Sequence, residues 1–259
     1  MSRDAVRQTV VVVTAVTQAI VGLFGDRVGE VSDQFTSPTT PAGYAFAIWG
    51  VIYLAALVFA VYQALPSHRG DQVLARAGWP AAAAFTANAL WVPTFQMEWF
   101  WAAQGLITLA LIGGVWALLA LARAGRSGLS RWHRWLARLP LALLAGWVTV
   151  AFSAGLTITL VSAELLEDGY GFGAVVWALL ALLVTGAFAV GVTLALRGSF
   201  AYPAAVAWGT FAIMVEHLGE NVLVGLVAGV VTVAVLAAGG LDLRDRYGTS
   251  RPAKGRAGT

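Results

Sequence analysis

A carboxamide and an indole lie close together in the apolar run AAAFTANALWVPTFQ, residues 82–96. Asn88 and Trp91 are about one helical turn apart, and Pro93 would free a backbone carbonyl one turn earlier and kink a helix. No charged residue is near, so Asn88 is not half of an ion pair. Because an unpaired amide is costly in hydrocarbon, Asn88 either hydrogen-bonds a neighbouring helix, for about 0.6 kcal/mol, or orients a ligand in a cavity.

Aromatic side chains are concentrated in a second stretch, SPTTPAGYAFAIWGVIYL at residues 37–54. Its prolines give a stiff, extended approach that prevents an early helix start. Trp49 and Tyr53 are four residues apart and share a helical face, and Phe46 lies one turn before Trp49. Tyr44 and Phe46 suit an interfacial belt, but Tyr53 is too deep for one. The stripe is either packing against a neighbouring helix or the wall of a ligand site.

Titratable residues offer little catalytic chemistry. The chain has no cysteine, which excludes disulfides and thiolate metal sites. The stretch EHLGEN, residues 216–221, would suit a metal site or proton relay if it were helical and buried, but Gly219 favours a loop with solvated carboxylates. His68 and His133 lie in loops among arginines and show no visible chemistry. Without a nucleophile–base set, we expect no catalytic residue, no metal and no enzyme activity.

Composition decides the class of protein. The chain is 59% hydrophobic and 11% charged, with a mean hydropathy of +0.77, whereas soluble domains carry about 25% charged residues. So much apolar surface would not stay in solution, and the long apolar runs predict an all-α integral membrane protein. The net charge of +3 is explained by membrane topology, so we expect no nucleic acid as a partner.

Each crossing of a hydrocarbon core needs about 20 apolar helical residues, and we count about eight such segments. The seventh is short and contains Pro203, which makes it the least typical. The chain between them holds no soluble domain, and the one sizeable loop is residues 25–42. The predicted spans are residues 6–24, 43–65, 75–95, 99–122, 135–162, 172–196, 200–215 and 221–241.

The distribution of basic residues supports this count. With a cytoplasmic N-terminus, fifteen of the sixteen lysines and arginines fall on the inner side, and only Arg27 is outside. Acidic residues such as Glu30 and Glu98 fall on the outer face. The positive-inside bias therefore predicts a multi-pass protein with both termini cytoplasmic. The apolar run after Arg3 and Arg7 lacks a clear cleavage site, so we expect it to remain as the first span.

Three motifs, taken in order, resemble the TspO/MBR family, which includes the translocator protein and the tryptophan-rich sensory proteins. They are TPAGYAFAIWGVIYL, then NALWVPTF, then LPLALLAGWVTVAFSAGLT. The first keeps the family's W-x-x-x-Y spacing, the second matches N-x-x-W-x-P-x-F at every position, and the third is similar to the family's later P…W segment. The residues that carry these matches are Trp49, Tyr53, Asn88, Trp91, Pro93, Phe95, Pro140 and Trp147.

The sequence departs from the family pattern at three positions. Tyr44 stands where tryptophan is usual, Phe46 is one residue closer to Trp49 than in the pattern, and Gly155 occupies a place where asparagine is expected. The resemblance covers about residues 1–160, the five spans typical of the family, and the three later spans have no account in it.

The resemblance implies a five-helix bundle around an apolar cavity, with the loop after the first span as its lid. We expect residues 1–162 to form this bundle, residues 163–243 to add three spans, and residues 244–259 to form a basic cytoplasmic tail. The long bacterial form of the family would place the protein in the cytoplasmic (inner) membrane.

The ligands implied by the resemblance are flat, hydrophobic molecules such as porphyrins, haem and sterols. Indoles and phenols offer wide faces for stacking and a polar group for a carboxylate or ring nitrogen. Asn88 would line the cavity, and Phe35 is a candidate contact from the lid. No cofactor is required, and a tetrapyrrole is expected as ligand. The predicted ligand-binding residues are Phe35, Tyr44, Phe46, Trp49, Tyr53, Asn88, Trp91, Phe95 and Trp147.

Three functions compete. The favoured one is a membrane receptor or sensor for a flat hydrophobic ligand. The alternative is a secondary transporter of a small hydrophobic metabolite, although no inverted repeat is evident. Porphyrin degradation, proposed for some family members, is the third, and we do not expect it here. The predicted partners are a hydrophobic small molecule and membrane lipid, and small residues such as Gly113–Gly114 would suit a homodimer.

Overall fold

The chain is all-helical in the computed structural model, which describes residues 2–25, 27–35, 37–124, 129–166, 172–196 and 198–248. No strand occurs in the part of the chain that the structure describes. The predicted all-α class is therefore confirmed. The predicted tail from residue 249 onward lies outside the described residues, as does Thr36 of the predicted lid.

Long helices occupy the positions of the eight predicted segments. Pro203 lies in the first turn of its helix, where a missing N–H group is tolerated. The long helices are α1 (Arg3–Gly22), α3 (Ile48–Ala64), α4 (Gln72–Gln96), α5 (Phe100–Ala124), α7 (Leu139–Ser162), α8 (Phe172–Leu196), α9 (Ala201–His217) and α10 (Val222–Gly248). The short ones are α2 (Arg27–Gln34), η1 (Gly43–Ala47), η2 (Pro66–His68), α6 (Arg131–His133) and η3 (Arg134–Arg138).

Six helical segments of the described residues are long and apolar enough to cross a membrane. They are Arg3–Gly22, Gly43–Ala64, Phe100–Ala124, Arg131–Ser162, Gly173–Leu196 and Val222–Leu241. Helix α9 has only 17 residues, and α4 carries Arg76, Asn88 and two internal prolines. Most of α9 and about half of α4 are buried against other helices, so they need less apolar surface. Length and composition thus support six of the eight predicted crossings.

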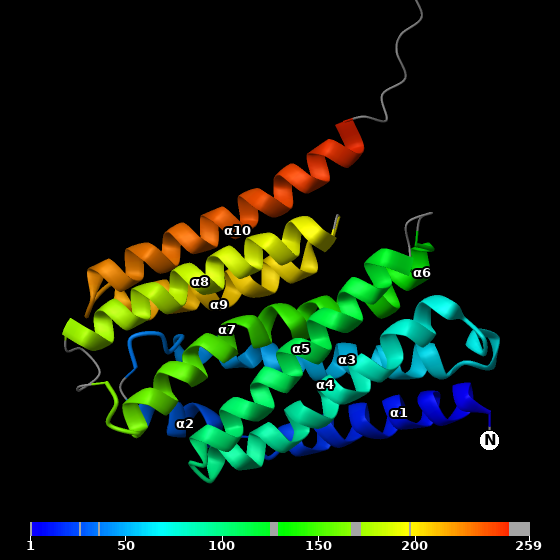
Figure 1. The fold of residues 1–259 in the computed structure, drawn as a ribbon, viewed down its shortest axis with the longest axis horizontal. Coiled ribbons are helices and arrows are strands. Elements are labelled where there is room, and N and C mark those ends of the chain that lie inside the picture. The colour runs from blue at the N-terminus through cyan, green and yellow to red at the C-terminus, as the bar shows by residue number, and fades with distance from the viewer. Residues whose placement is uncertain are drawn as a thin grey trace, which may run out of the picture.

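The helices form two layers that meet at α7 (Figure 1). In the first layer, α4 packs between α1 and α5, and α5 packs against α7. In the second layer α10 packs against α8 and α9, and α9 joins the layers by packing against α7. In the most apolar stretch of the segment Arg131–Ser162, which contains α7, 72% of the residues are buried. In the corresponding stretch of α1, 28% of the residues are buried. Helix α7 is therefore the central element of the structure.

The glycine pair considered for a homodimer is used inside the chain. A Cβ atom on Gly113 would lie 2.8 Å from the carbonyl oxygen of Pro80 in α4, and one on Gly114 would lie 3.5 Å from Ala145 in α7. Both glycines thus permit close packing of α5 against its own neighbours, and the homodimer stays a prediction.

Part of the predicted loop at residues 25–42 is helical. Helix α2 is only eight residues long, but Val28 and Val31 lie one turn apart and are both buried. It packs against α4 near the point where Gln96 Nε2 donates to the carbonyl of Phe24, at 3.0 Å. This end of the molecule is called the α2 end below.

Candidate ligand-binding site

A pocket lies at the α2 end, between α2, α3, α4 and α7. It spans about 420 Å³ when the space through which it opens outward is counted, but only about 30 Å³ of this is free internal cavity. A cavity of that size has room for no more than a few water molecules, so a larger ligand would have to displace the side chains that line it. The walls are almost entirely apolar or aromatic. The lining residues are Val28, Ser32, Pro41, Phe46, Trp49, Trp91, Phe95, Trp147, Val150, Ala151, Ala154, Gly155 and Ile158.

Trp49 is the centre of the aromatic wall. Its ring centroid lies 5.8 Å from that of Trp91 and 6.0 Å from that of Trp147, which it meets edge to face. Phe46 contacts Trp147 at 6.0 Å, and Trp91 stacks on Phe95 at 5.1 Å. These five residues, called the aromatic cluster, come from η1, α3, α4 and α7. All five were predicted from the sequence as ligand-binding residues, and all five line the pocket.

Tyr53 and Asn88 lie behind this wall. The Tyr53 ring stacks on Trp49, with 5.5 Å between centroids and 17° between planes. Asn88 is fully buried, and its Nδ2 donates to Oε1 of Gln18 in α1 at 3.1 Å. The Asn88 side chain lies beside the Tyr53 side chain. Neither residue is among those that line the pocket. Asn88 therefore links α1 to α4, and Tyr53 supports the aromatic cluster from behind.

Phe35 and Tyr44 occupy other positions. Phe35 contacts Phe100 at 4.7 Å, and Phe100 contacts Phe95 at 5.4 Å, so Phe35 is two rings away from the pocket wall. Tyr44 is 46% exposed and meets Trp208 of α9 at 5.6 Å. The structure therefore brings seven of the nine predicted residues together at the pocket or directly behind it.

A carboxamide from α5 occupies the space over Gly155. A Cβ atom on this glycine would lie 2.9 Å from Oε1 of Gln104. Nε2 of Gln104 donates to the carbonyl of Phe152 at 3.3 Å, and a carbonyl only accepts, so the amide orientation is fixed. Oε1 of Gln104 and the indole N–H of Trp147 are buried and have no hydrogen-bond partner among the described residues. Trp147 lines the pocket, and the Gln104 oxygen lies against Gly155 of its lining.

Gln18 and Gln104 were not selected from the sequence. Each is a carboxamide in an apolar run, which is the same signal that singled out Asn88. The expected asparagine at position 155 is absent, and the side chain of Gln104 comes from the neighbouring helix to the same place.

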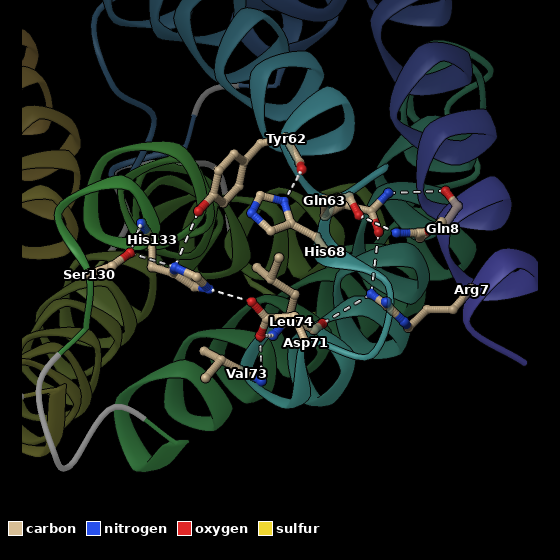
Figure 2. A network of polar contacts seen from close by, with 10 residues as sticks. All are labelled: Arg7, Gln8, Tyr62, Gln63, His68, Asp71, Val73, Leu74, Ser130 and His133. Carbon is tan, nitrogen blue, oxygen red and sulfur yellow. Dashed lines mark hydrogen bonds and ion pairs between the residues drawn. The ribbon is translucent and has the colours of Figure 1, made fainter. Parts of the chain in front are cut away.

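A second polar group, the distal network, lies at the opposite end of the bundle (Figure 2). Asp71 caps α4 by accepting from two backbone N–H groups of that helix, at 2.9 and 3.1 Å. His133 Nε2 lies 3.0 Å from Asp71 Oδ2, and its Nδ1 lies 2.7 Å from Ser130 Oγ and 3.2 Å from the Tyr62 hydroxyl. These contacts join the ends of α3, α4 and α6.

The distal network also includes a buried arginine (Figure 2). Arg7 is 2% exposed, and its Nη1 donates to Gln63 Oε1 and to the Leu74 carbonyl, both at 3.3 Å. Gln8 and Gln63 exchange hydrogen bonds with each other's backbone carbonyls, at 2.7 and 3.0 Å. Helix α1 is thereby fixed to α3 and α4 at the end of the bundle opposite the aromatic pocket.

The distal network is a structural clamp. Ser130, His133 and Asp71 are the residue types of a hydrolytic triad, but Ser130 Oγ accepts the backbone N–H of His133 at 3.1 Å and so caps α6. Among the described residues, no group of three histidine or carboxylate side chains is placed to hold a metal ion. No sequence pattern connects His133 with Asp71, which is 62 residues away.

The fold and the site define a helical, multi-pass membrane protein with a buried aromatic cluster. A comparison of the sequence with models of protein families identifies the family. The chain belongs to the TSPO-like protein family, because the family model described as TSPO-like protein matches residues 5–241. The match includes α8, α9 and α10, so the family's pattern extends beyond the first five spans. Membership supports a membrane protein of the sensor or ligand-binding kind. No match was found among curated proteins or among solved structures.

The Asn88–Gln18 hydrogen bond predicts a coupled effect on stability. Asn88→Leu leaves Gln18 buried without this partner, so the free energy of unfolding should fall by about 1–3 kcal/mol. The double variant with Gln18→Leu should cost less than the sum of the two single changes, since no unpaired amide remains. Thermal unfolding of the purified protein in detergent measures all four combinations. Additive effects would contradict the pairing.

Because Asp71 is part of the clamp, we expect the free energy of unfolding to depend on pH in the acid range. Burial raises the pKa of Asp71, but the N–H of Leu74, the imidazole of His133 and the N–H of Val73 together outweigh it, so the pKa is below its ordinary value of 3.8. A carboxyl with a lowered pKa stabilises the fold above pH 3.8, and this contribution is lost as the pH falls through the lowered pKa.

Two substitutions separate the roles of Asp71. Asn remains a good helix cap, so Asp71→Asn should remove only the interaction with His133, about 0.5–1 kcal/mol at pH 7. Asp71→Ala removes the cap as well and should cost about 1 kcal/mol more. The difference between wild type and Asp71→Asn should shrink in acid. A constant difference from pH 7 to pH 3 in thermal unfolding would refute the charged role.

Proposed function

We propose that this protein is a membrane receptor that binds a flat, hydrophobic ligand of the tetrapyrrole type at the aromatic cluster. The observation that carries the proposal is the pocket in which Trp49, Trp91 and Trp147 converge from three helices. Each indole is at most 9% exposed, although indoles in membrane proteins are usually found at the interface. Three indoles on one pocket wall provide wide stacking faces for a conjugated ring.

Binding would require the rings to separate. In the structure the aromatic side chains contact one another, so a ligand inserted between them replaces ring–ring contacts with ring–ligand contacts. Helix α2 contributes Val28 and Ser32 to the lining, and it lies where the predicted lid was expected. The donor of Trp147 and the acceptor of Gln104 would then orient polar groups on the ligand. Tyr53 stacks on Trp49 from behind.

We further propose that all eight long helices cross the membrane, with the distal network on the cytoplasmic side. Helix α4 lies between α1 and α5, and α9 lies against α7 and α10, so both share the span of their apolar neighbours. The arginines Arg3, Arg69, Arg76 and Arg134 lie near the distal network, which agrees with the positive-inside rule for the inner membrane. Both termini would then be cytoplasmic.

Binding without turnover is the activity that we propose. The pocket lining contains no histidine, carboxylate or cysteine, and its polar side-chain groups are the hydroxyl of Ser32 and the indole N–H groups. Such groups hold a ligand but do not provide a nucleophile–base pair.

Quenching of tryptophan fluorescence by protoporphyrin IX tests the proposal. Wild type in detergent should show saturable quenching at micromolar concentration or better. Trp49→Leu should weaken binding by about tenfold or more, because the central stacking face is lost. The matched control is Trp116→Leu, since Trp116 is 61% exposed on α5 and is not among the residues that line the pocket. Quenching that does not saturate, or that both variants reduce equally, would contradict the proposal and turn attention to the transporter alternative.

A further inference from the structure

One wall of the pocket is a single segment of backbone held from outside by α9. This rim segment, residues 40–47, supplies Pro41 and Phe46 to the pocket lining and leads directly into Trp49. It contains a proline and a tight helical turn, so it lacks the continuous hydrogen bonding of an α-helix. Its buried polar backbone groups therefore need partners from elsewhere in the chain.

Helix α9 provides those partners. Nε2 of His217 donates to the Thr40 carbonyl at 3.0 Å, and the indole N–H of Trp208 donates to the Ala45 carbonyl at 3.0 Å. Between them, the N–H of Ala42 donates to the carbonyl of Ala212 at 3.3 Å. The three bonds follow successive turns of α9, so they fix the rim segment along its length.

Helix α9 also supports the opposite wall. A Cβ atom on Gly146 of α7 would lie 2.6 Å from the Tyr202 carbonyl oxygen, so the two backbones are in direct contact. The Tyr202 hydroxyl lies 3.1 Å from Thr149 Oγ1. Gly209 allows α9 to pack on Val150, which lines the pocket. One helix thus stands behind both α7 and the rim segment.

We propose that α9 is the positioning element of the pocket, with Trp208 and His217 as the residues that set the place of the rim segment. This inference rests on the proposed function, since it assumes that the pocket binds a ligand. The three C-terminal helices then have a role at the site. They form a second layer beside it, and ligand binding is coupled to this layer through α9. A ligand that separates the rings then pushes the rim segment against α9.

Hydrogen exchange of the full chain tests this coupling without any ligand. Trp208→Phe keeps an aromatic ring but removes the donor to Ala45, and His217→Leu removes the donor to Thr40. Each variant should speed exchange of the amides in residues 38–48 by about three- to tenfold, the change expected for one net hydrogen bond. Trp116→Phe is the matched control, because it also removes one indole but from an exposed site.

The same variants are then titrated with protoporphyrin IX. We expect Trp208→Phe and His217→Leu to raise its dissociation constant by a similar factor, while Trp116→Phe leaves it unchanged. Unchanged exchange in residues 38–48 for both variants would overturn the proposal. So would faster exchange with unchanged binding, or an increase spread evenly over all helices.

The two proposals fail in distinguishable ways. If wild type does not bind protoporphyrin IX, the proposed function fails for this ligand, and the exchange data still decide whether α9 holds the rim segment. If Trp208→Phe does not fold, His217→Leu alone decides, because its hydrogen bond lies at the other end of the segment.

Discussion

A polar group inside a membrane protein has no water to bond, and this constraint decides how the helices of this chain are joined. Asn88 pairs with Gln18, Gln63 with Gln8, and Gln104 with the carbonyl of Phe152. Each pair connects two helices at a fixed register. Near the pocket, the Trp147 N–H and the Gln104 Oε1 have no such partner among the described residues. We propose that the ligand supplies the hydrogen-bond partners that these two groups lack.

The two ends of the bundle therefore differ in character. At the distal end, charged and polar side chains neutralise one another, and the helix ends are clamped by Arg7, Asp71 and His133. At the α2 end, aromatic rings meet without covalent or ionic ties, so they can part at modest cost in packing. A clamped end and an end that can open are what a buried receptor site requires. Helix α9 limits the opening by holding the rim segment to the second layer.

The sequence predicted the helices and the aromatic wall because both depend on local spacing. Trp49, Trp91 and Trp147 were found from motif intervals and apolar runs. It did not predict that Tyr44 turns to Trp208 or that His217 meets Thr40, since these pairs are more than 160 residues apart. The alternative uses of Asn88 were also open, because its partner Gln18 is 70 residues away. The sequence predicts a loop where α2 lies, because a segment of eight mostly polar residues is too short to show a helical period, and only the structure shows that Val28 and Val31 are buried on one face.

Photo-oxidation can show whether the ligand lies in the aromatic cluster. Illuminated protoporphyrin IX generates oxidants beside itself, and mass spectrometry then reports which of the 11 tryptophans are modified. We expect modification first at Trp49, Trp91 and Trp147, although all three are buried. An excess of an unreactive metalloporphyrin should protect them. Modification confined to the exposed indoles Trp99, Trp101 and Trp116 would contradict a ligand in the aromatic cluster.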